Sequence, residues 1–350
     1  MLVEVFAVSC VPHKSICKDQ NITGYPKVKL FLTGSTDGTL VNWYEIHPFD
    51  ILRMIGVQTT ELDEESTPTT TKGTTAQIRS GQQEESIQEE QFFLQRTKKD
   101  VYNDAYLSFD FSMRNGIFTS EGPLTNTTKE VFSEWVYLLQ SFLPPVWALQ
   151  TMIGDIIDNM DHVVESEANL LEIIDKYPPK KKSWSHSCSR GDSFSGYTCG
   201  LWELFHIVSI GLVEYNHLIL GDDDWTTSRT QDAAETIRDF ISHFFGCEVC
   251  RLNFLHAFDA CANDRCNRLS TDAGEYEDWK EFPMWLYETH NAVNARLLRE
   301  RAEQEGKPVP TKADLVDVQW PSRRDCPQCW HGDGRWDPDK VYIYLRLVYW

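Results

Sequence analysis

Several features are missing from this chain. It has no uninterrupted run of about 18 apolar residues, so no membrane-spanning helix is predicted. Basic residues are few, because 33 Lys and Arg stand against 53 Asp and Glu, for a net charge of −20. A nucleic-acid-binding protein needs a basic face to meet phosphate, so the charge argues against this class. No Gly-x-Gly-x-x-Gly motif occurs, so a Rossmann-type dinucleotide site is not predicted.

Two segments lack the residues that a signal peptide or a folded domain would contain. The N-terminal stretch MLVEVFAVSC has no basic residue and contains Glu4, so it does not fit a signal peptide. Residues 58–91 contain no aromatic side chain and consist mainly of Thr, Ser, Gln and Glu. Such a segment cannot bury enough apolar surface to fold. We therefore predict a disordered acidic and Thr-rich linker over 58–91.

The stretches on either side of this linker differ in their periodicity. Residues 1–57 contain a short buried-strand pattern, LVEVFAV, and the alternating segment PKVKLFL, in which Val28, Leu30 and Leu32 share one face. From residue 92 the pattern is helical. Thr127 and Glu130 are spaced as a capping box, ahead of an apolar stripe formed by Val131, Trp135, Leu138, Leu139 and Phe142. A second helix is predicted over roughly 150–176, which makes 92–185 a helix-rich region.

The C-terminal half, 186–350, also reads as helical and shows no convincing strand. Pro283 suits the first turn of a helix. The pattern predicts helices over 200–217, 231–245, 248–259, 283–303 and 337–348. A small all-helical domain is the expected architecture.

Ten cysteines sort by proximity into five local pairs. They are Cys10 and Cys17, Cys188 and Cys199, Cys247 and Cys250, Cys261 and Cys266, and Cys326 and Cys329. An even, locally paired set indicates disulfides formed in an oxidising compartment. Two glycosylation triplets, at Asn21 and Asn126, are compatible with a secreted glycoprotein.

The Cys247-x-x-Cys250 pair in HFFGCEVC has three readings. Together with Cys326-x-x-Cys329 it could supply four thiolates to zinc, but about 75 residues separate the pairs, more than compact zinc modules use. A disulfide staple is the second reading, although so small a loop removes little entropy from the unfolded chain. The third is a redox dithiol, because Gly246 breaks the helical pattern and leaves Cys247 at a helix N-terminus, which favours thiolate.

A redox dithiol needs an electron acceptor, and a flavin would need stacking aromatics and polar contacts. Trp202 and His206 are four residues apart and share a helix face, as do His290 and Asn294, with Asn291 beside them. Each of these side chains taken alone also fits an ordinary helix core. Among the other pairs, Cys188 with Cys199 closes a longer loop and is the better staple. Cys10 with Cys17 and Cys261 with Cys266 also read as structural disulfides.

Four blocks in order resemble one known family. CGLWELFH, FFGCEVC, THNAVNARL and VQWPSRRDCPQCW are similar to the FAD-dependent sulfhydryl oxidase domain of the Erv/ALR type, and the whole order resembles a quiescin sulfhydryl oxidase. The implied fold is mainly α. It comprises an FAD-binding helical bundle over 186–350, the helix-rich region, and a partial thioredoxin-like α/β fragment over 1–57.

The resemblance also implies an activity and a set of roles. Such an enzyme oxidises protein dithiols through FAD to O2 and releases H2O2 in the secretory pathway or outside the cell. Cys250 would be the flavin-proximal thiolate and Cys247 the interchange cysteine. The positions matching FAD contacts are Trp202, His206, Asn253, Tyr287, His290, Asn291, Asn294 and Trp320. The role of Cys326 and Cys329 differs within the family, and no metal is expected.

The chain departs from the family pattern at several places. Val249 and Asn253 stand where acidic or histidine residues are common, and Ser195 and Asp317 replace basic residues. The thioredoxin-like front lacks its own Cys-x-x-Cys, which implies an incomplete N-terminus. The alternatives are a zinc-binding interaction module, which would be colourless, and a flavin-free disulfide isomerase.

Overall fold

The computed structural model describes residues 28–30, 39–41, 97–145, 147–189, 193–219, 227–269 and 275–350. In the N-terminal part, β1 (Val28–Leu30) pairs antiparallel with β2 (Thr39–Val41), with Val28 opposite Val41. The strand predicted in PKVKLFL is thus confirmed over β1. The pair Cys10 and Cys17, the Asn21 triplet and the linker 58–91 lie outside the described residues.

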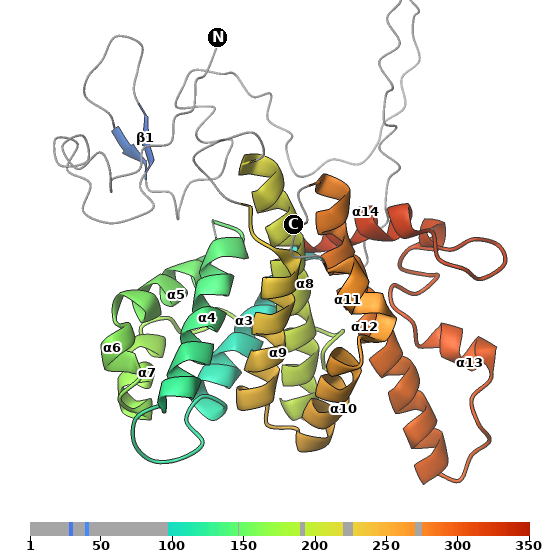
Figure 1. The fold of residues 1–350 in the computed structure, drawn as a ribbon, viewed down its shortest axis with the longest axis horizontal. Helices are drawn as coiled ribbons and strands as arrows, with labels where there is room; N and C mark the ends of the chain where they lie inside the picture. The colour runs from blue at the N-terminus through green and yellow to red at the C-terminus, as the bar shows by residue number, and fades with distance from the viewer. Residues whose placement is uncertain are drawn as a thin grey trace, which may run out of the picture. The chain divides into compact units, whose positions relative to one another are not determined.

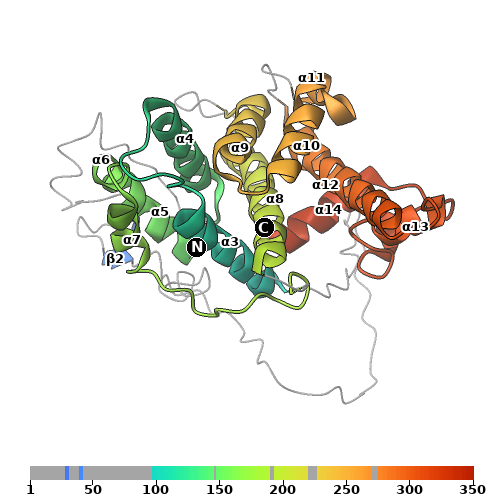
Figure 2. The same cartoon turned by 90° about the horizontal axis from the view of Figure 1, so that it is seen from below.

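Residues 90–350 form one compact unit, which is helical (Figures 1 and 2). Its longer helices are α3 (Lys98–Asn115), α4 (Asn126–Phe142), α5 (Ala148–Asp158), α8 (Ser193–Ile219), α9 (Thr230–Phe244), α10 (Glu248–Asp259), α12 (Tyr276–Gln304) and α14 (Pro338–Tyr349). The short ones are α6 (Met160–Val163), α7 (Glu167–Ile174), η1 (Ala262–Asp264), α11 (Arg265–Arg268), α13 (Lys312–Asp317) and η2 (Pro327–Cys329). The mainly α fold class is confirmed.

Helix α8 is the centre of the bundle and packs against α3, α4, α12 and α14 (Figure 1). Two glycines permit this close packing. A Cβ on Gly200 would lie 2.3 Å from the Asp104 carbonyl oxygen of α3, and one on Gly211 would lie 1.8 Å from the Phe142 carbonyl oxygen of α4. The helix-rich stretch before residue 185 and the cysteine-rich stretch after it therefore share one core.

By length and composition, Gly196–Ile219 is apolar enough to cross a membrane, which the sequence analysis did not predict. In the structure, 83% of its most apolar window is buried inside the protein. The apolar character of α8 is accounted for by the four helices that pack around it.

Several predicted helix boundaries are wrong. The predicted capping box at Thr127 and Glu130 is absent, because α4 begins earlier and Thr125 caps it by accepting a hydrogen bond from the Thr128 amide at 3.2 Å. The predicted helix over 150–176 is divided into α5, α6 and α7, because the chain turns at Asn159 and Ser166 starts a new helix as its N-cap.

Helix α12 also begins seven residues before the proline that was expected in its first turn. Pro283 lies inside the helix. The first two turns are kept helical by tertiary packing, because Trp279 and Phe282 are completely buried in the core. By contrast, α10 spans Glu248–Asp259 as predicted, and α9 and α14 differ from prediction by one residue at each end.

Candidate active site

Cys247 and Cys250 form a disulfide with an S–S distance of 2.05 Å at the start of α10. Helix α9 ends at Phe244, and the short link through Gly246 turns the chain directly into α10. Cys247 is the N-cap, and its Sγ accepts a hydrogen bond from the Cys250 amide at 3.3 Å. The pair therefore sits where free backbone N–H groups and the helix dipole stabilise a thiolate once the disulfide opens.

A cavity of about 220 Å³ lies beside this disulfide, between α8, α9, α10 and α12. Cys250 lines it, whereas Cys247 does not. The walls are mainly apolar and aromatic, with Trp202 and Phe205 from α8, Phe245 at the end of α9 and Phe254 from α10. Cys250 therefore faces this apolar cavity, whereas Cys247 lies outside its lining and is partly exposed.

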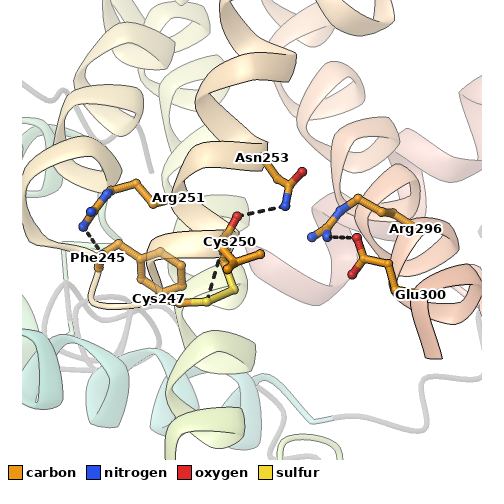
Figure 3. Close-up of a disulfide and its surroundings, with 8 residues drawn as sticks. Phe245, Cys247, Cys250, Arg251, Asn253, Arg296 and Glu300 are labelled. Carbon is orange, nitrogen blue, oxygen red and sulfur yellow. Dashed lines mark hydrogen bonds and ion pairs between the residues drawn. A yellow bond between two sulfur atoms is a disulfide. The ribbon is translucent and has the colours of Figure 1, made fainter. Parts of the chain in front are cut away.

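Polar side chains also line this cavity. Among them are Asn253 of α10 and Arg296 of α12, which Figure 3 shows on two different helices. The Asn253 amide donates to the Val249 carbonyl at 2.8 Å, and Arg296 pairs with Glu300 at 2.6 Å. Arg296 was not among the predicted site residues. Its spacing from the cavity residues Thr289, Ala292 and Val293 follows one helical face, a signal that could have identified it.

Several of the predicted residues form an aromatic cluster with Trp202. The Trp202 ring stacks on His290 with centroids 4.2 Å apart and planes 2° apart. His206 Nε2 lies 3.2 Å from His290 Nδ1, so one imidazole donates to the other. The Trp320 ring lies 5.3 Å from His206. Two helices and a C-terminal loop, distant in sequence, thus meet here as the resemblance implied.

The Asn291 side chain contacts this cluster through hydrogen bonds to the Trp320 backbone. Its side-chain amide donates to the Trp320 carbonyl at 2.7 Å, and its oxygen accepts from the Trp320 amide at 2.8 Å. The peptide bond that follows, Trp320–Pro321, is cis. Asn291 therefore holds Trp320 in position, so its side chain is already engaged by the protein.

Replacing Asn291 by alanine is expected to lower the free energy of unfolding by about 1–3 kcal/mol, because two part-buried backbone groups of Trp320 lose their partner. Urea unfolding followed by tryptophan fluorescence measures the change. Asn294→Ala, on the same helix and half-buried, is the matched control and should have a small effect. Equal losses from both variants would contradict the positioning role.

The remaining predicted contacts occupy different surroundings. Tyr287 is buried, and its hydroxyl has no hydrogen-bond partner within the part of the chain that the structure describes. Burial, with a smaller contribution from Glu288, raises the pKa of the Tyr287 hydroxyl, which keeps it a neutral donor. Asn294 is half-buried on α12 and is not among the residues that line the cavity. Of the predicted set, only Cys250, Trp202 and Asn253 line the cavity itself.

The other described cysteines are also paired as expected. Disulfides join Cys188 to Cys199, Cys261 to Cys266 and Cys326 to Cys329. Because both Cys-x-x-Cys pairs are oxidised, neither offers thiolates to a metal. One further group of possible ligands, Cys188, Cys199 and Glu203, occurs among the described residues, and its two sulfurs are bonded to each other.

Comparison with known proteins confirms the resemblance. Residues 199–321 match the model of the Erv1 / Alr family. The chain is 31% identical over 158 residues to sulfhydryl oxidase 2 of Arabidopsis thaliana, covering 44% of this chain and 26% of the relative. It is 29% identical over 172 residues to sulfhydryl oxidase 1 of Gallus gallus, covering 48% and 19%.

The fold also matches a solved structure, the sulfhydryl oxidase fragment of human QSOX1. The TM-score is 0.53 at 19% identity, over 71% of this chain and 93% of that one. The chain spans about a quarter or less of the length of the curated relatives named above.

Proposed function

We propose that this protein is an FAD-dependent sulfhydryl oxidase, because residues 199–321 match the model of the Erv1 / Alr family. Its substrates are reduced protein dithiols, which it converts to disulfides, with O2 as final acceptor and H2O2 as product. The observation that carries the proposal is the Cys247–Cys250 disulfide at a helix N-terminus, with Cys250 on the wall of an aromatic cavity.

The two cysteines have separate tasks. A substrate thiolate attacks Sγ of Cys247, which is partly exposed and does not line the cavity. The Cys247–Cys250 bond breaks, and Cys250 leaves as a thiolate facing the cavity, where the N-terminus of α10 stabilises its charge. The second substrate thiolate then releases Cys247, so that two electrons have moved from the substrate to the pair.

The residues at the cavity fit a flavin. The cavity is lined mainly by apolar and aromatic side chains, which suits a planar ring system. Trp202 offers a face for stacking, Asn253 a polar group, and Arg296 a cation for an anionic part of the ligand. The Tyr287 hydroxyl, which has no partner among the described residues, and the cluster around His206, His290 and Trp320 are proposed as further contacts. FAD bound there would supply the two-electron acceptor that O2 reoxidises.

Two measurements on the purified full chain test the proposal. An absorbance band at about 450 nm would identify a bound flavin. Oxygen consumption with a reduced protein, matched by H2O2 release, would identify the reaction. A colourless protein carrying stoichiometric zinc would favour the alternative of a zinc-binding interaction module, which no observation in the structure supports. A colourless, metal-free protein would leave a flavin-free isomerase.

The surface around the catalytic pair suggests which dithiols are preferred. Val249 is 65% exposed and Leu252 is 56% exposed, on the same helix as the disulfide. A substrate whose thiolate reaches Cys247 must cover part of this helix. Polypeptides with apolar side chains near their cysteines are therefore the proposed substrates.

Leu252→Glu is expected to lower kcat/KM for a reduced protein roughly 3- to 10-fold, the equivalent of about 1 kcal/mol of apolar contact. Turnover of dithiothreitol should stay unchanged, because so small a dithiol does not need the patch. Val309→Glu replaces another exposed apolar residue, 81% exposed and outside α10, and is the control. Equal loss with both substrates would show that the variant damages the site instead of the docking surface.

The proposed setting is the secretory pathway or the extracellular space. Four disulfides occur in the described part of the chain, and such bonds persist in oxidising compartments. Asn126, at the start of α4, is exposed and so accessible for glycosylation there.

A further inference from the structure

The Cys261–Cys266 disulfide differs from the other non-catalytic pairs in its exposure. It follows α10 directly, with a Cα–Cα distance of 5.4 Å. Cys266 is exposed and Cys261 partly exposed. Cys326 and Cys329, by contrast, are fully buried. Of these two pairs, the one joining Cys261 and Cys266 is therefore open to attack by a thiolate from solution.

A guanidinium group stands beside one of its sulfurs. Arg265 Nη2 lies 3.3 Å from Cys266 Sγ. The arginine is buried and fixed, because its guanidinium carbon lies 3.8 Å from the centre of the Phe258 ring and its Nε donates to the Phe258 carbonyl at 3.2 Å. A fixed cation at this distance stabilises the Cys266 thiolate, which makes Cys266 the better leaving group.

Neighbouring carboxylates do not cancel this charge. Asp259 and Glu235 act on Arg265 through space, but neither forms an ion pair with it in the described part of the chain. Asp259 is engaged instead by Arg238, at 3.3 Å. The group in hydrogen-bond contact with Cys266 Sγ is thus the positive one.

The backbone of the loop also favours opening. Cys261, Asn263 and Asp264 have φ values of 55°, 55° and 58°, in the left-handed region. Asn and Asp tolerate that region, whereas cysteine adopts it rarely. The covalent bond to Cys266 helps to hold Cys261 there, so its loss lets the backbone relax and favours the reduced form.

The loop is also part of the cavity wall. Ala262 and Asn263 line the cavity that Cys250 lines, and the Asn263 amide donates to Thr289 Oγ1 of α12 at 3.2 Å. A loss of order in this loop therefore changes the wall of the cavity proposed for the cofactor.

From these observations we propose that Cys261–Cys266 is a second thiol–disulfide exchange site, reduced by dithiols, whose opening loosens the cavity wall at Ala262 and Asn263. A thiolate of the dithiol attacks Sγ of Cys261, and the bond to Cys266 breaks, releasing Cys266 as a thiolate beside Arg265. The second thiol of the dithiol then displaces Cys261 and closes its own disulfide. Two electrons pass from the dithiol to the pair, one proton goes to Cys261 and one to solvent.

The test measures how easily each disulfide is reduced in the full-length protein. The chain is equilibrated without O2 in glutathione buffers of increasing reducing strength, free thiols are alkylated, and each pair is quantified by peptide mass spectrometry. Cys261–Cys266 should be half reduced at a [GSH]²/[GSSG] at least roughly 10-fold lower than Cys188–Cys199, a gap of about 30 mV. Oxidase activity is not needed for this result, so it is independent of the proposed function.

Variants of Arg265 test whether its charge makes Cys261–Cys266 easier to reduce. Arg265→Met should raise the half-reduction value of Cys261–Cys266 roughly 10-fold, and Arg265→Lys, which keeps the charge, should raise it less. Arg229→Met removes an arginine whose partner, Asp232, does not act on Arg265, so it is the control and should leave the value unchanged. Hydrogen exchange of the amides in 261–268 should rise between buffers below and above the half-reduction value of Cys261–Cys266. A half-reduction value equal to that of Cys188–Cys199, no effect of Arg265→Met, or unchanged hydrogen exchange would overturn the proposal.

Discussion

Replacing Cys250 by serine is expected to lower dithiol-dependent oxygen consumption by a factor on the order of 1,000 or more, because the two cysteines act as one unit and removing either stops electron transfer. The serine variant cannot form the disulfide that accepts electrons from the substrate. An oxygen electrode with a reduced protein as substrate gives the rate. Far-UV circular dichroism and the flavin content of the variant show whether the fold and cofactor site persist.

A matched pair elsewhere in the chain separates chemistry from general loss of a disulfide. Cys326 and Cys329 form the other Cys-x-x-Cys disulfide, and both are fully buried, away from the cavity lining. Their double serine variant should keep most of the turnover if it folds. Full oxygen consumption by Cys250→Ser would rule out the proposed route through Cys247 and Cys250.

The local features of the site follow from the sequence. Gly246 breaks the helical pattern, and Cys247 caps the next helix, so the bounds of α10 were predicted to the residue. Trp202 and His206 were placed on one face by their spacing, and their rings lie 6.2 Å apart in the structure. Such features depend on neighbours within one or two helical turns, where sequence periodicity is informative.

Features that depend on tertiary contact were not predicted. Pro283 marks a helix start by local preference, yet buried Trp279 and Phe282 extend α12 beyond it. The hydrogen bonds from Asn291 to the Trp320 backbone join positions 29 residues apart, which no spacing rule connects. Arg265 was likewise ordinary in the sequence, and only the folded loop brings its guanidinium to Cys266 Sγ.

Trp135→Ala is expected to be among the most destabilising substitutions in the described chain, with a loss of about 3–5 kcal/mol in the free energy of unfolding. Trp135 on α4 is completely buried. Its ring stacks on Phe240 of α9 at 4.3 Å and meets the edge of Phe205 of α8 at 5.8 Å. Phe205 also lines the cavity. The variant therefore removes the packing that links the helix-rich region to the cavity.

The same residue tests whether residues 97–350 unfold as one unit. Because the aromatic stack joins α4 to α8 and α9, Trp135→Ala should shift a single urea transition and release flavin in parallel. Trp135→Phe keeps a ring in the stack and removes an indole N–H that has no partner in the described part of the chain, so its cost should be smaller. Tyr137→Ala, at a position 52% exposed on the same helix, should cost little. Two separate transitions, with flavin release following only the second, would mean that the helix-rich region and the oxidase region fold independently despite their shared core.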